Sequence, residues 1–297
     1  MAGNTGWGKW KWVLFFLTPS LVGLLVFIII PIITSLGYAF TDWNLLSPPE
    51  YIGTANFQEL LGSDRFWLAL RNTVFMIALY LPLAFTLGLA LALFLNRRFR
   101  GMLVVRTATY IPVIASWVVV SLVWKWIFNP SYGLVNYGLG LVGIEGPAWL
   151  FEPVSAMFAI VITSVWKDMG FIALLFLGGL QNISETYYEA ARLDGANPWR
   201  LIRHITLPLL SPTMFFVVIT LLINYFQMFA QVWLMPMQNS AADRQVETIV
   251  TEVVTNAFSY NRMGYASAMS WVLFAIIFVI TFIQLRLQNR WVYYESE

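Results

Sequence analysis

The chain has 297 residues, of which 59% are hydrophobic and only 11% are charged, and its formal net charge is +2. A soluble domain carries about 25% charged residues, so this composition excludes an ordinary water-soluble fold and indicates a protein of the lipid bilayer. The small net charge argues against a nucleic-acid partner, and a chain with one His and no Cys offers no ligand cluster for zinc, haem or iron–sulfur centres.

Six apolar segments are long enough to cross a bilayer, which takes about 20 helical residues. Because a membrane-spanning chain forms either helices or a closed barrel, and these segments lack the alternation of barrel strands, we predict an all-α integral membrane protein with six transmembrane helices. The first segment is longer than the apolar core of a signal peptide and lacks a cleavage site, so we expect it to remain as a span. In chain order the predicted spans are 12–38, 68–95, 107–128, 156–180, 208–235 and 265–285, within a single transmembrane domain of residues 1–297.

Basic residues gather in alternate loops, which predicts the orientation of the chain. Under the positive-inside rule these loops are cytoplasmic, so both termini are expected in the cytoplasm. The opposite loops carry mostly Asp and Glu. The basic residues that predict this orientation are Lys9 and Lys11, then Arg97, Arg98, Arg100 and Arg106, then Arg192, Arg200 and Arg203, and finally Arg286 and Arg290.

The cytoplasmic loop 181–207 is predicted to form two short helices joined by a turn. Asn182 or Ser184 can cap the first helix, and Gly195 can end it in a positive-φ conformation. Asn197 followed by Pro198 is typical of the start of a second helix. From local physics alone, this loop is either a solvated helical hairpin or a docking surface for another protein.

The same loop resembles the EAA motif of binding-protein-dependent ABC importer permeases. Its residues run Glu189-Ala190-Ala191, then Asp194-Gly195-Ala196, then Ile205-x-Leu207-Pro208, at the spacing of that motif. Ile202 departs from the pattern, which often has Phe there. In that family the loop forms a coupling helix that sits in a cleft of the ATPase subunit. The resemblance therefore implies that the coupling residues are Glu189, Ala190, Ala191, Asp194 and Gly195.

The resemblance extends over essentially the whole chain and points to the carbohydrate-uptake branch, the maltose and glycerol-phosphate type, as the first permease of its pair. Weaker motifs in its support are Thr41-Asp42-Trp43, Gly53-x-x-Asn56-Phe57, Asn72-Thr73, Gly133-Leu134-Val135-Asn136 and Gly264-Tyr265-Ala266-Ser267-Ala268. The implied partners are a second homologous permease, two ATPase subunits that hold ATP and Mg, an extracytoplasmic solute-binding protein and a sugar, in a bacterial or archaeal cytoplasmic membrane. The chain has no Gly-x-x-x-x-Gly-Lys-Ser/Thr loop, so it is expected to bind no cofactor or metal and to be no enzyme.

Polar side chains inside a membrane span are costly and usually face a cavity or a neighbouring helix. The fifth span places several at helical spacing on one face, and the fourth and third spans add others. Amides and hydroxyls can exchange hydrogen bonds with sugar hydroxyls, so a substrate pathway is one explanation, and packing between helices is the other. The candidate pathway residues are Ser116, Ser164, Asp168, Phe171, Asn224, Tyr225, Gln227, Met228 and Gln231. For Lys167 and Asp168, contact with the second permease is a further alternative.

Two other functions stay open from the sequence. An ion-coupled secondary transporter would need acidic residues inside the membrane, and Asp168 is the one that qualifies. A membrane-embedded enzyme would need a nucleophile, a metal cluster or an acid pair in the bilayer, and the sequence offers no such set. Within the importer class, the absence of Arg from the fourth and fifth spans favours a neutral sugar over a phosphorylated one.

Overall fold

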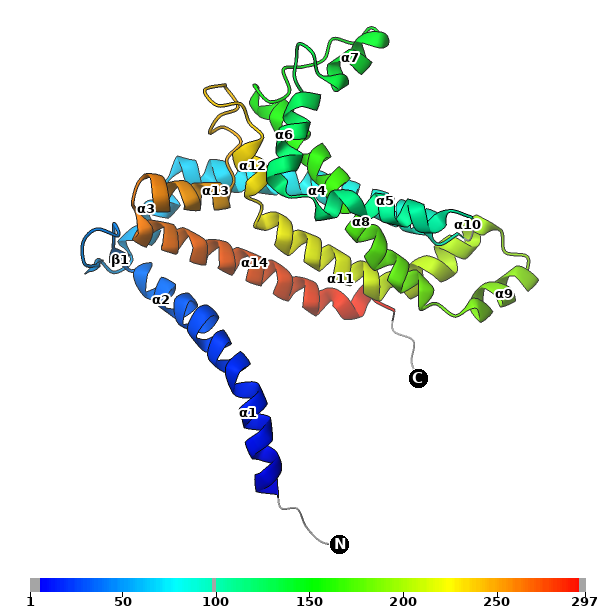
Figure 1. The fold of residues 1–297 in the computed structure, drawn as a ribbon, viewed down its shortest axis with the longest axis horizontal. Coiled ribbons are helices and arrows are strands. Elements are labelled where there is room, and N and C mark those ends of the chain that lie inside the picture. The colour runs from blue at the N-terminus through cyan, green and yellow to red at the C-terminus, as the bar shows by residue number, and fades with distance from the viewer. Residues whose placement is uncertain (1–5, 98–99, 294–297) are drawn as a thin grey trace. The chain divides into compact units, whose positions relative to one another are not determined.

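The computed structural model describes residues 6–97 and 100–293. Arg98, one of the basic residues expected in the cytoplasm, lies outside this part of the chain, as do residue 99 and both ends of the expected single domain. The chain divides into two compact units, which are described separately: residues 1–63 with 253–273, and residues 64–252 with 274–297. Apart from one short hairpin, the described elements are helices, as Figure 1 shows.

The first unit holds an apolar helical segment and a small hairpin. Its elements are α1 (Gly6–Leu24), the π turn η1 (Leu25–Ile29), α2 (Ile30–Tyr38), β1 (Thr41–Asp42), β2 (Glu50–Tyr51), α3 (Ala55–Gly62) and the π turn η3 (Thr255–Ser259). The strands pair antiparallel, with Thr41 opposite Tyr51. Asn56 fixes the hairpin, because its amide donates to the carbonyls of Ala39 at 3.0 Å and Thr41 at 2.9 Å. A Cβ at Gly264 would collide with the Thr41 carbonyl, so two of the weaker sequence motifs have a structural role here.

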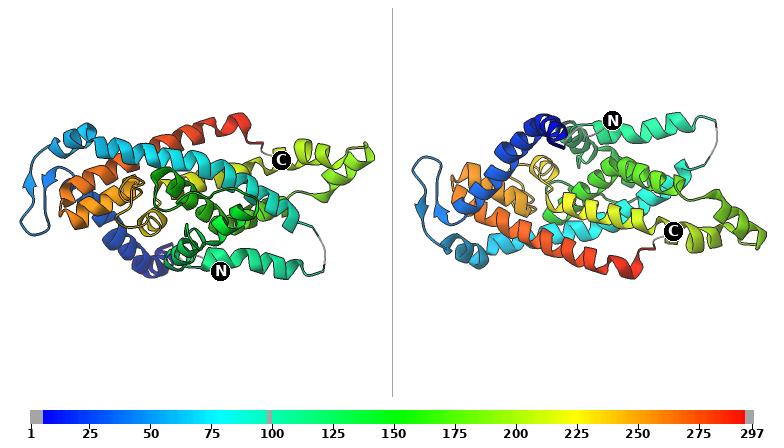
Figure 2. Two further views of the ribbon diagram at one scale, coloured as in Figure 1. Left: turned by 90° about the horizontal axis from the view of Figure 1, so that it is seen from above. Right: turned by 90° about the horizontal axis from the view of Figure 1, so that it is seen from below.

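The second unit contains most of the helices. They are α4 (Asp64–Leu95), α5 (Met102–Ile114), α6 (Trp117–Ile127), α7 (Leu134–Leu141), α8 (Pro153–Gln181), α9 (Glu185–Leu193), α10 (Pro198–Leu201), the π turn η2 (Ile202–Thr206), α11 (Leu207–Phe226) and α12 (Ala230–Leu234). Two further helices, α13 (Ile249–Val254) and α14 (Met263–Trp291), cross from one unit to the other. Helix α8 is central to this unit, because α4, α5 and α11 all pack against it (Figure 2). Gly88 lets α4 approach closely, since a Cβ there would collide with Ile172 of α8.

The prediction of a helical membrane protein is confirmed. The helices long and apolar enough to cross a bilayer are Lys11–Tyr38, Asp64–Leu95, Pro153–Gln181, Pro198–Leu234 and Met263–Gln288. Helices α5 and α6 pass the same test together, but they are bent by 98°. The described residues thus give 5 candidate spans, or 6 if the bent pair is a single span.

The expected third span, 107–128, is not one continuous helix. Ala115 and Ser116 both have extended backbone conformations, with ψ of 137° and 148°, and they separate α5 from α6. Ser116 caps α6, because its hydroxyl accepts a hydrogen bond from the Val119 amide at 3.4 Å. The segment predicted as the third span therefore corresponds to this bent pair of helices.

The expected fifth span, 208–235, is also interrupted. Helix α11 ends at Phe226 and α12 begins at Ala230. The last turn of α11 tightens, because the amides of Gln227 and Met228 bond to carbonyls three residues back, each at 3.2 Å. Phe229 then adopts φ −135° and ψ −62°, which is outside the helical region. The polar side chains expected on one face of the fifth span, from Asn224 to Gln231, therefore do not lie on one continuous helix.

Candidate functional site

A cavity of about 390 Å³ opens within the second unit, and we call it the inner cavity. Helices α4, α6, α8, α11 and α12 contribute to its wall, together with the interruption 227–229. It brings together seven of the predicted pathway residues, namely Asp168, Phe171, Asn224, Tyr225, Gln227, Met228 and Gln231. The interruption of the fifth span therefore leaves these side chains in the wall of one cavity, although they do not share one helix face.

Asp168 is oriented by a tyrosine that the sequence did not single out. The Tyr80 hydroxyl donates to Asp168 Oδ2 at 2.8 Å. The Tyr80 ring stacks on Tyr225, with centroids 3.7 Å apart and planes 10° from parallel. Tyr80 lies in the middle of an apolar span. From the sequence, only the need of a buried phenol hydroxyl for a hydrogen-bond partner could have indicated its role. The cavity therefore contains a carboxylate whose position is fixed by two aromatic rings.

Lys167 is turned away from the inner cavity. Its side chain is buried, and its Nζ donates to the carbonyls of Val113 at 3.0 Å and Pro112 at 3.4 Å. These carbonyls lie in the last turn of α5, where the break before α6 removes their helical donors. Nζ also lies 5.3 Å from the Trp117 ring centroid. Among the described lining residues, Asp168 is the one acidic or basic side chain.

Two predicted pathway residues do not line the inner cavity. Ser164 is fully buried, and its hydroxyl donates to the Ile160 carbonyl at 2.8 Å. Ser116 serves as the cap of α6 described above. Both hydroxyls therefore have local structural partners, and sequence position alone could not distinguish them from pathway residues.

The chemistry of the inner cavity suits a ligand with many hydroxyl groups. Asn224 and Gln227 are exposed to it and offer both amide donors and carbonyl acceptors. Trp117, Phe171 and Phe229 supply aromatic surface nearby. Sites with an apolar lining and a few placed polar groups are typical of small-molecule binding.

The loop after α8 has the local structure expected from the sequence. Ser184 caps α9, with its hydroxyl accepting from the Thr186 amide at 3.4 Å. Gly195 has φ +79°, and the Ala196 amide closes the helix end on the Ala191 carbonyl at 2.9 Å. The Asn197 side chain accepts from the Arg200 amide at 2.9 Å and so starts α10.

The predicted coupling residues lie at the exposed end of this loop. Glu189, Ala190, Asp194 and Gly195 are exposed, and Ala191 is half-buried. Two large apolar side chains stand beside them, with Leu193 89% and Trp199 67% exposed. Exposed apolar groups of this size beside charged residues mark a surface that can bind another protein.

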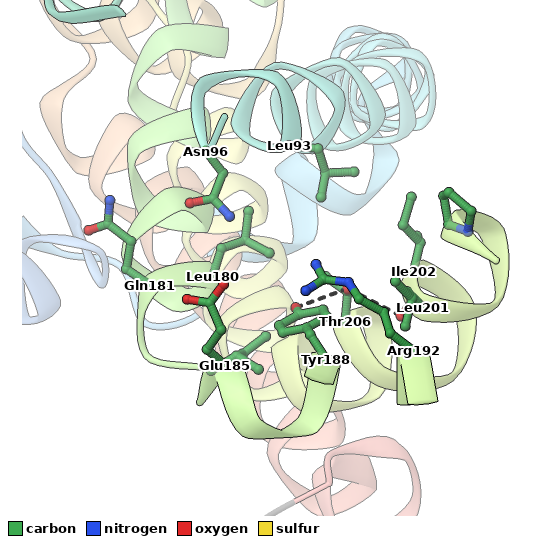
Figure 3. A pocket seen from close by; sticks show the side chains of 12 residues that line it. Leu93, Asn96, Leu180, Gln181, Glu185, Tyr188, Arg192, Leu201, Ile202 and Thr206 are labelled. Atoms are coloured by element: carbon green, nitrogen blue, oxygen red, sulfur yellow. Dashed lines mark hydrogen bonds between the residues drawn. The ribbon is translucent and has the colours of Figure 1, made fainter. Parts of the chain in front are cut away.

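A second cavity, of about 510 Å³, separates α9 from the ends of α4 and α8. Figure 3 shows Glu185, Tyr188 and Arg192 of α9 lining this cavity. The Tyr188 hydroxyl reaches across to Thr206 Oγ1 of η2 at 3.1 Å. Helix α9 thus presents one polar face to the cavity and stands partly clear of the membrane-spanning helices.

Comparison with known proteins identifies a family over most of the chain. The sequence pattern of the binding-protein-dependent transport system inner membrane component matches residues 84–293. The probable ABC transporter permease protein YesP of Bacillus subtilis is 35% identical over 285 residues, which cover 95% of this chain and 92% of that protein. The trehalose/maltose transport system permease protein MalF of Thermococcus litoralis is 32% identical and covers 90% of both chains.

A solved structure has the same fold. In the bacterial alginate ABC transporter, crystallised with a periplasmic protein that holds an alginate pentasaccharide, one chain matches with a TM-score of 0.84 and 26% identity. The match covers 95% of this chain and 96% of that one. The resemblance expected from the loop 181–207 is therefore confirmed at the level of the whole chain: it belongs to the family of binding-protein-dependent inner membrane permeases of ABC transporters.

Proposed function

We propose that the chain is the permease subunit of an ATP-driven sugar importer and forms the translocation pathway together with a second, homologous permease. The inner cavity carries this proposal, because it combines a carboxylate, two exposed amides and several aromatic rings among apolar helices. Hydrogen-bonding groups beside aromatic surface are what a sugar requires, since its hydroxyls and its ring faces need different partners. The relative from Thermococcus litoralis is named for trehalose and maltose transport, which agrees with this ligand class.

The solute is a neutral sugar in this proposal. Asp168 lines the inner cavity, whereas the neighbouring Lys167 is turned to the end of α5, so a negatively charged solute would meet a carboxylate without a compensating cation. The alginate transporter, by contrast, imports an acidic polysaccharide. We therefore expect the two cavities to differ in charge.

Coupling to ATP takes place through α9 and the turn after it. Two ATPase subunits bind ATP and Mg, and their closure moves the loop 181–207 through the residues Glu189, Ala190, Ala191, Asp194 and Gly195. The exposed Leu193 and Trp199 add apolar contact area to this surface. The chain itself performs no hydrolysis and holds no cofactor.

The membrane topology completes the proposal. The chain forms one permease domain with six spans, in which the bent pair α5 and α6 is the third. Both termini lie in the cytoplasm, and a solute-binding protein delivers the sugar from the other side. The family membership supports this arrangement, because its members work with such binding proteins.

The test begins with a tagged chain purified from its native membrane in mild detergent, with mass spectrometry of the proteins recovered with it. The expected result is a second permease and an ATPase. The recovered complex and its binding protein are then reconstituted in proteoliposomes, where sugar uptake should require ATP. Recovery of this chain alone, with uptake driven by an ion gradient and no ATP, would instead establish a secondary transporter.

The role of the inner cavity has its own test in the variant Asn224→Leu. This change removes one exposed amide from the cavity wall and keeps a side chain of similar size. We expect sugar uptake to fall at least tenfold while the ATPase and the second permease are recovered in normal amounts. Normal uptake would place Asn224 outside the pathway.

A further inference from the structure

Residues 245–252, which follow α12 and lead into α13, are held firmly on α4. The Asn72 amide donates to the carbonyls of Gln245 at 2.8 Å and Glu247 at 3.0 Å. The adjacent Thr73 accepts from the Ile249 amide at 3.2 Å. Both side chains of α4 are buried. The Asn72-Thr73 motif noted in the sequence thus attaches this segment to the second unit.

The same segment reaches the wall of the inner cavity. The Thr248 hydroxyl donates to the Met228 carbonyl at 3.3 Å, and Met228 belongs to the interruption 227–229. Thr248 is itself fixed by Thr251, whose hydroxyl accepts from the Thr248 amide at 2.7 Å and donates to the Thr248 carbonyl at 2.8 Å. If the packing of residues 245–252 on α4 changes, the position of Met228 should therefore change as well.

Two carboxyl groups of this segment share one arginine of α4. Arg65 lies 3.2 Å from Glu247 Oε2 and 3.5 Å from Glu252 Oε1. The arginine side chain is 52% exposed, whereas those of Glu247 and Glu252 are only 15% and 7% exposed. Arg244, which directly precedes this segment, also acts on Glu247 electrostatically. Glu247 and Glu252 thus lie beside the same guanidinium group, and both side chains are largely removed from solvent.

We propose that a proton on Glu247 keeps residues 245–252 on α4, and that loss of this proton loosens the segment and with it the Met228 wall of the inner cavity. A protonated Glu247 adds no negative charge beside Glu252 and Arg65. When Glu247 loses its proton, it places a buried negative charge beside the carboxyl group of Glu252, and repulsion opposes the close packing. On the proposed orientation the segment lies outside the cytoplasm, so external pH would control it.

The direction of the effect follows from Glu247. Burial, followed by the hydrogen bond and the charge of Glu252, raises the pKa of Glu247 from 4.5 to about 8. A carboxyl group whose pKa is raised on folding favours the folded arrangement most at pH values below its unfolded pKa, and this contribution is lost as pH rises through the folded pKa. The attachment of residues 245–252 is therefore expected to hold at pH 6 and to weaken above pH 8.

The direct test is amide hydrogen exchange of the complete complex in lipid nanodiscs at pH 6 and pH 9, corrected for the intrinsic pH dependence of exchange. Peptides that cover 245–252 and 225–230 should lose about tenfold in protection at the higher pH, in proportion to the protonated fraction. Glu247→Gln, which keeps a neutral side chain at every pH, should abolish this difference. Glu252→Gln provides a second variant of the same kind if the first does not fold.

A matched control is available in Glu59 of α3, another carboxylate that pairs with one arginine. Its Oε2 lies 2.6 Å from Arg262, and the pair is about half exposed. Glu59→Gln should retain the wild-type pH dependence at 245–252. Equal pH dependence in the wild type, Glu247→Gln and Glu252→Gln would overturn the proposal, as would a loss confined to 245–252 that leaves 225–230 unchanged.

A transport measurement adds a functional arm that rests on the proposed function. Uptake by the wild-type complex should change between pH 6 and pH 9, and Glu247→Gln should show no such step. Because hydrogen exchange needs no transport, a chain that fails to import sugar can still confirm the proton-controlled attachment. Unchanged exchange with normal ATP-dependent uptake would refute the attachment and leave the importer intact.

Discussion

Tyr80 and Asp168 form the most specific polar contact of the inner cavity, and removing the phenol hydroxyl tests what it does. In Tyr80→Phe the ring can still stack on Tyr225, but the 2.8 Å hydrogen bond to Asp168 Oδ2 is lost. A hydrogen bond to a charged group contributes about 1.5 to 3 kcal/mol. If Asp168 binds the sugar from this position, the half-saturating sugar concentration for uptake should rise about tenfold. An unchanged concentration dependence would show that the orientation of Asp168 does not matter for binding.

For Lys167 we expect an effect on stability and not on sugar binding, because its partners are backbone carbonyls. Lys167→Met keeps a long side chain but leaves the carbonyls of Pro112 and Val113 without their donor. An unsatisfied buried polar group costs about 1 to 3 kcal/mol, so the variant should melt at a lower temperature in detergent. Asp168→Asn is the comparison, since it should affect uptake more than melting. Lost uptake at an unchanged melting temperature in Lys167→Met would place Lys167 at the solute or the partner permease.

At the scale of elements, the sequence predicted the ends of helices better than their interruptions. Gly195 and the pair Asn197-Pro198 act through their own backbone, so the structure of loop 181–207 could be predicted locally. At the break formed by Ala115 and Ser116, by contrast, Lys167 lies far along the chain and donates to the last carbonyls of α5. Hydropathy measures only length and apolar character, and it cannot register such a partner.

The fifth span shows the same limit. Residues 227–229 contain neither Gly nor Pro, and the carbonyl of Met228 is bonded to Thr248, twenty residues away. Residue types at helical spacing still identified most of the inner cavity wall, because the interruption follows directly on α11 and moves these side chains only locally. Tyr80, Trp117 and Phe229 were missed because an aromatic residue in an apolar span gives no sign of which face it lies on.

The turn after α9 offers a test of coupling at this scale. Gly195 has φ +79°, and a side chain there would strain the backbone by about 1 to 2 kcal/mol, so Gly195→Val should disturb the turn. Gly143 is a matched control, because it has φ +75° and open space around it but lies between α7 and α8. Both variants should lose similar stability. We expect only Gly195→Val to lower uptake relative to ATP hydrolysis. An equal loss of uptake in both variants would show that the effect comes from lower stability and not from coupling.

At the scale of the whole molecule, many large apolar side chains are exposed and must be covered by lipid or by another protein. In the first unit, the most apolar stretch of the segment Lys11–Tyr38 contains no buried residue. In the second unit, Leu193 and Trp199 are exposed in the loop 181–207. A bilayer can cover the first of these surfaces. The second lies beside charged residues in a loop too polar for the bilayer core, which favours a protein partner.

The two acidic residues of α9 allow that partner surface to be located. Glu189 lies among the predicted coupling residues, whereas Glu185 lines the cavity behind the same helix (Figure 3). Reversing a charge at a docked surface places like charges together and costs several kcal/mol. Glu189→Arg should therefore reduce recovery of the ATPase with the tagged chain at least tenfold, while Glu185→Arg should leave it near normal. Recovery of the second permease serves as the internal control for folding in both. If Glu185→Arg loses the ATPase and Glu189→Arg keeps it, the ATPase binds the cavity face of α9 instead, and the coupling surface would have to be assigned to Glu185, Tyr188 and Arg192.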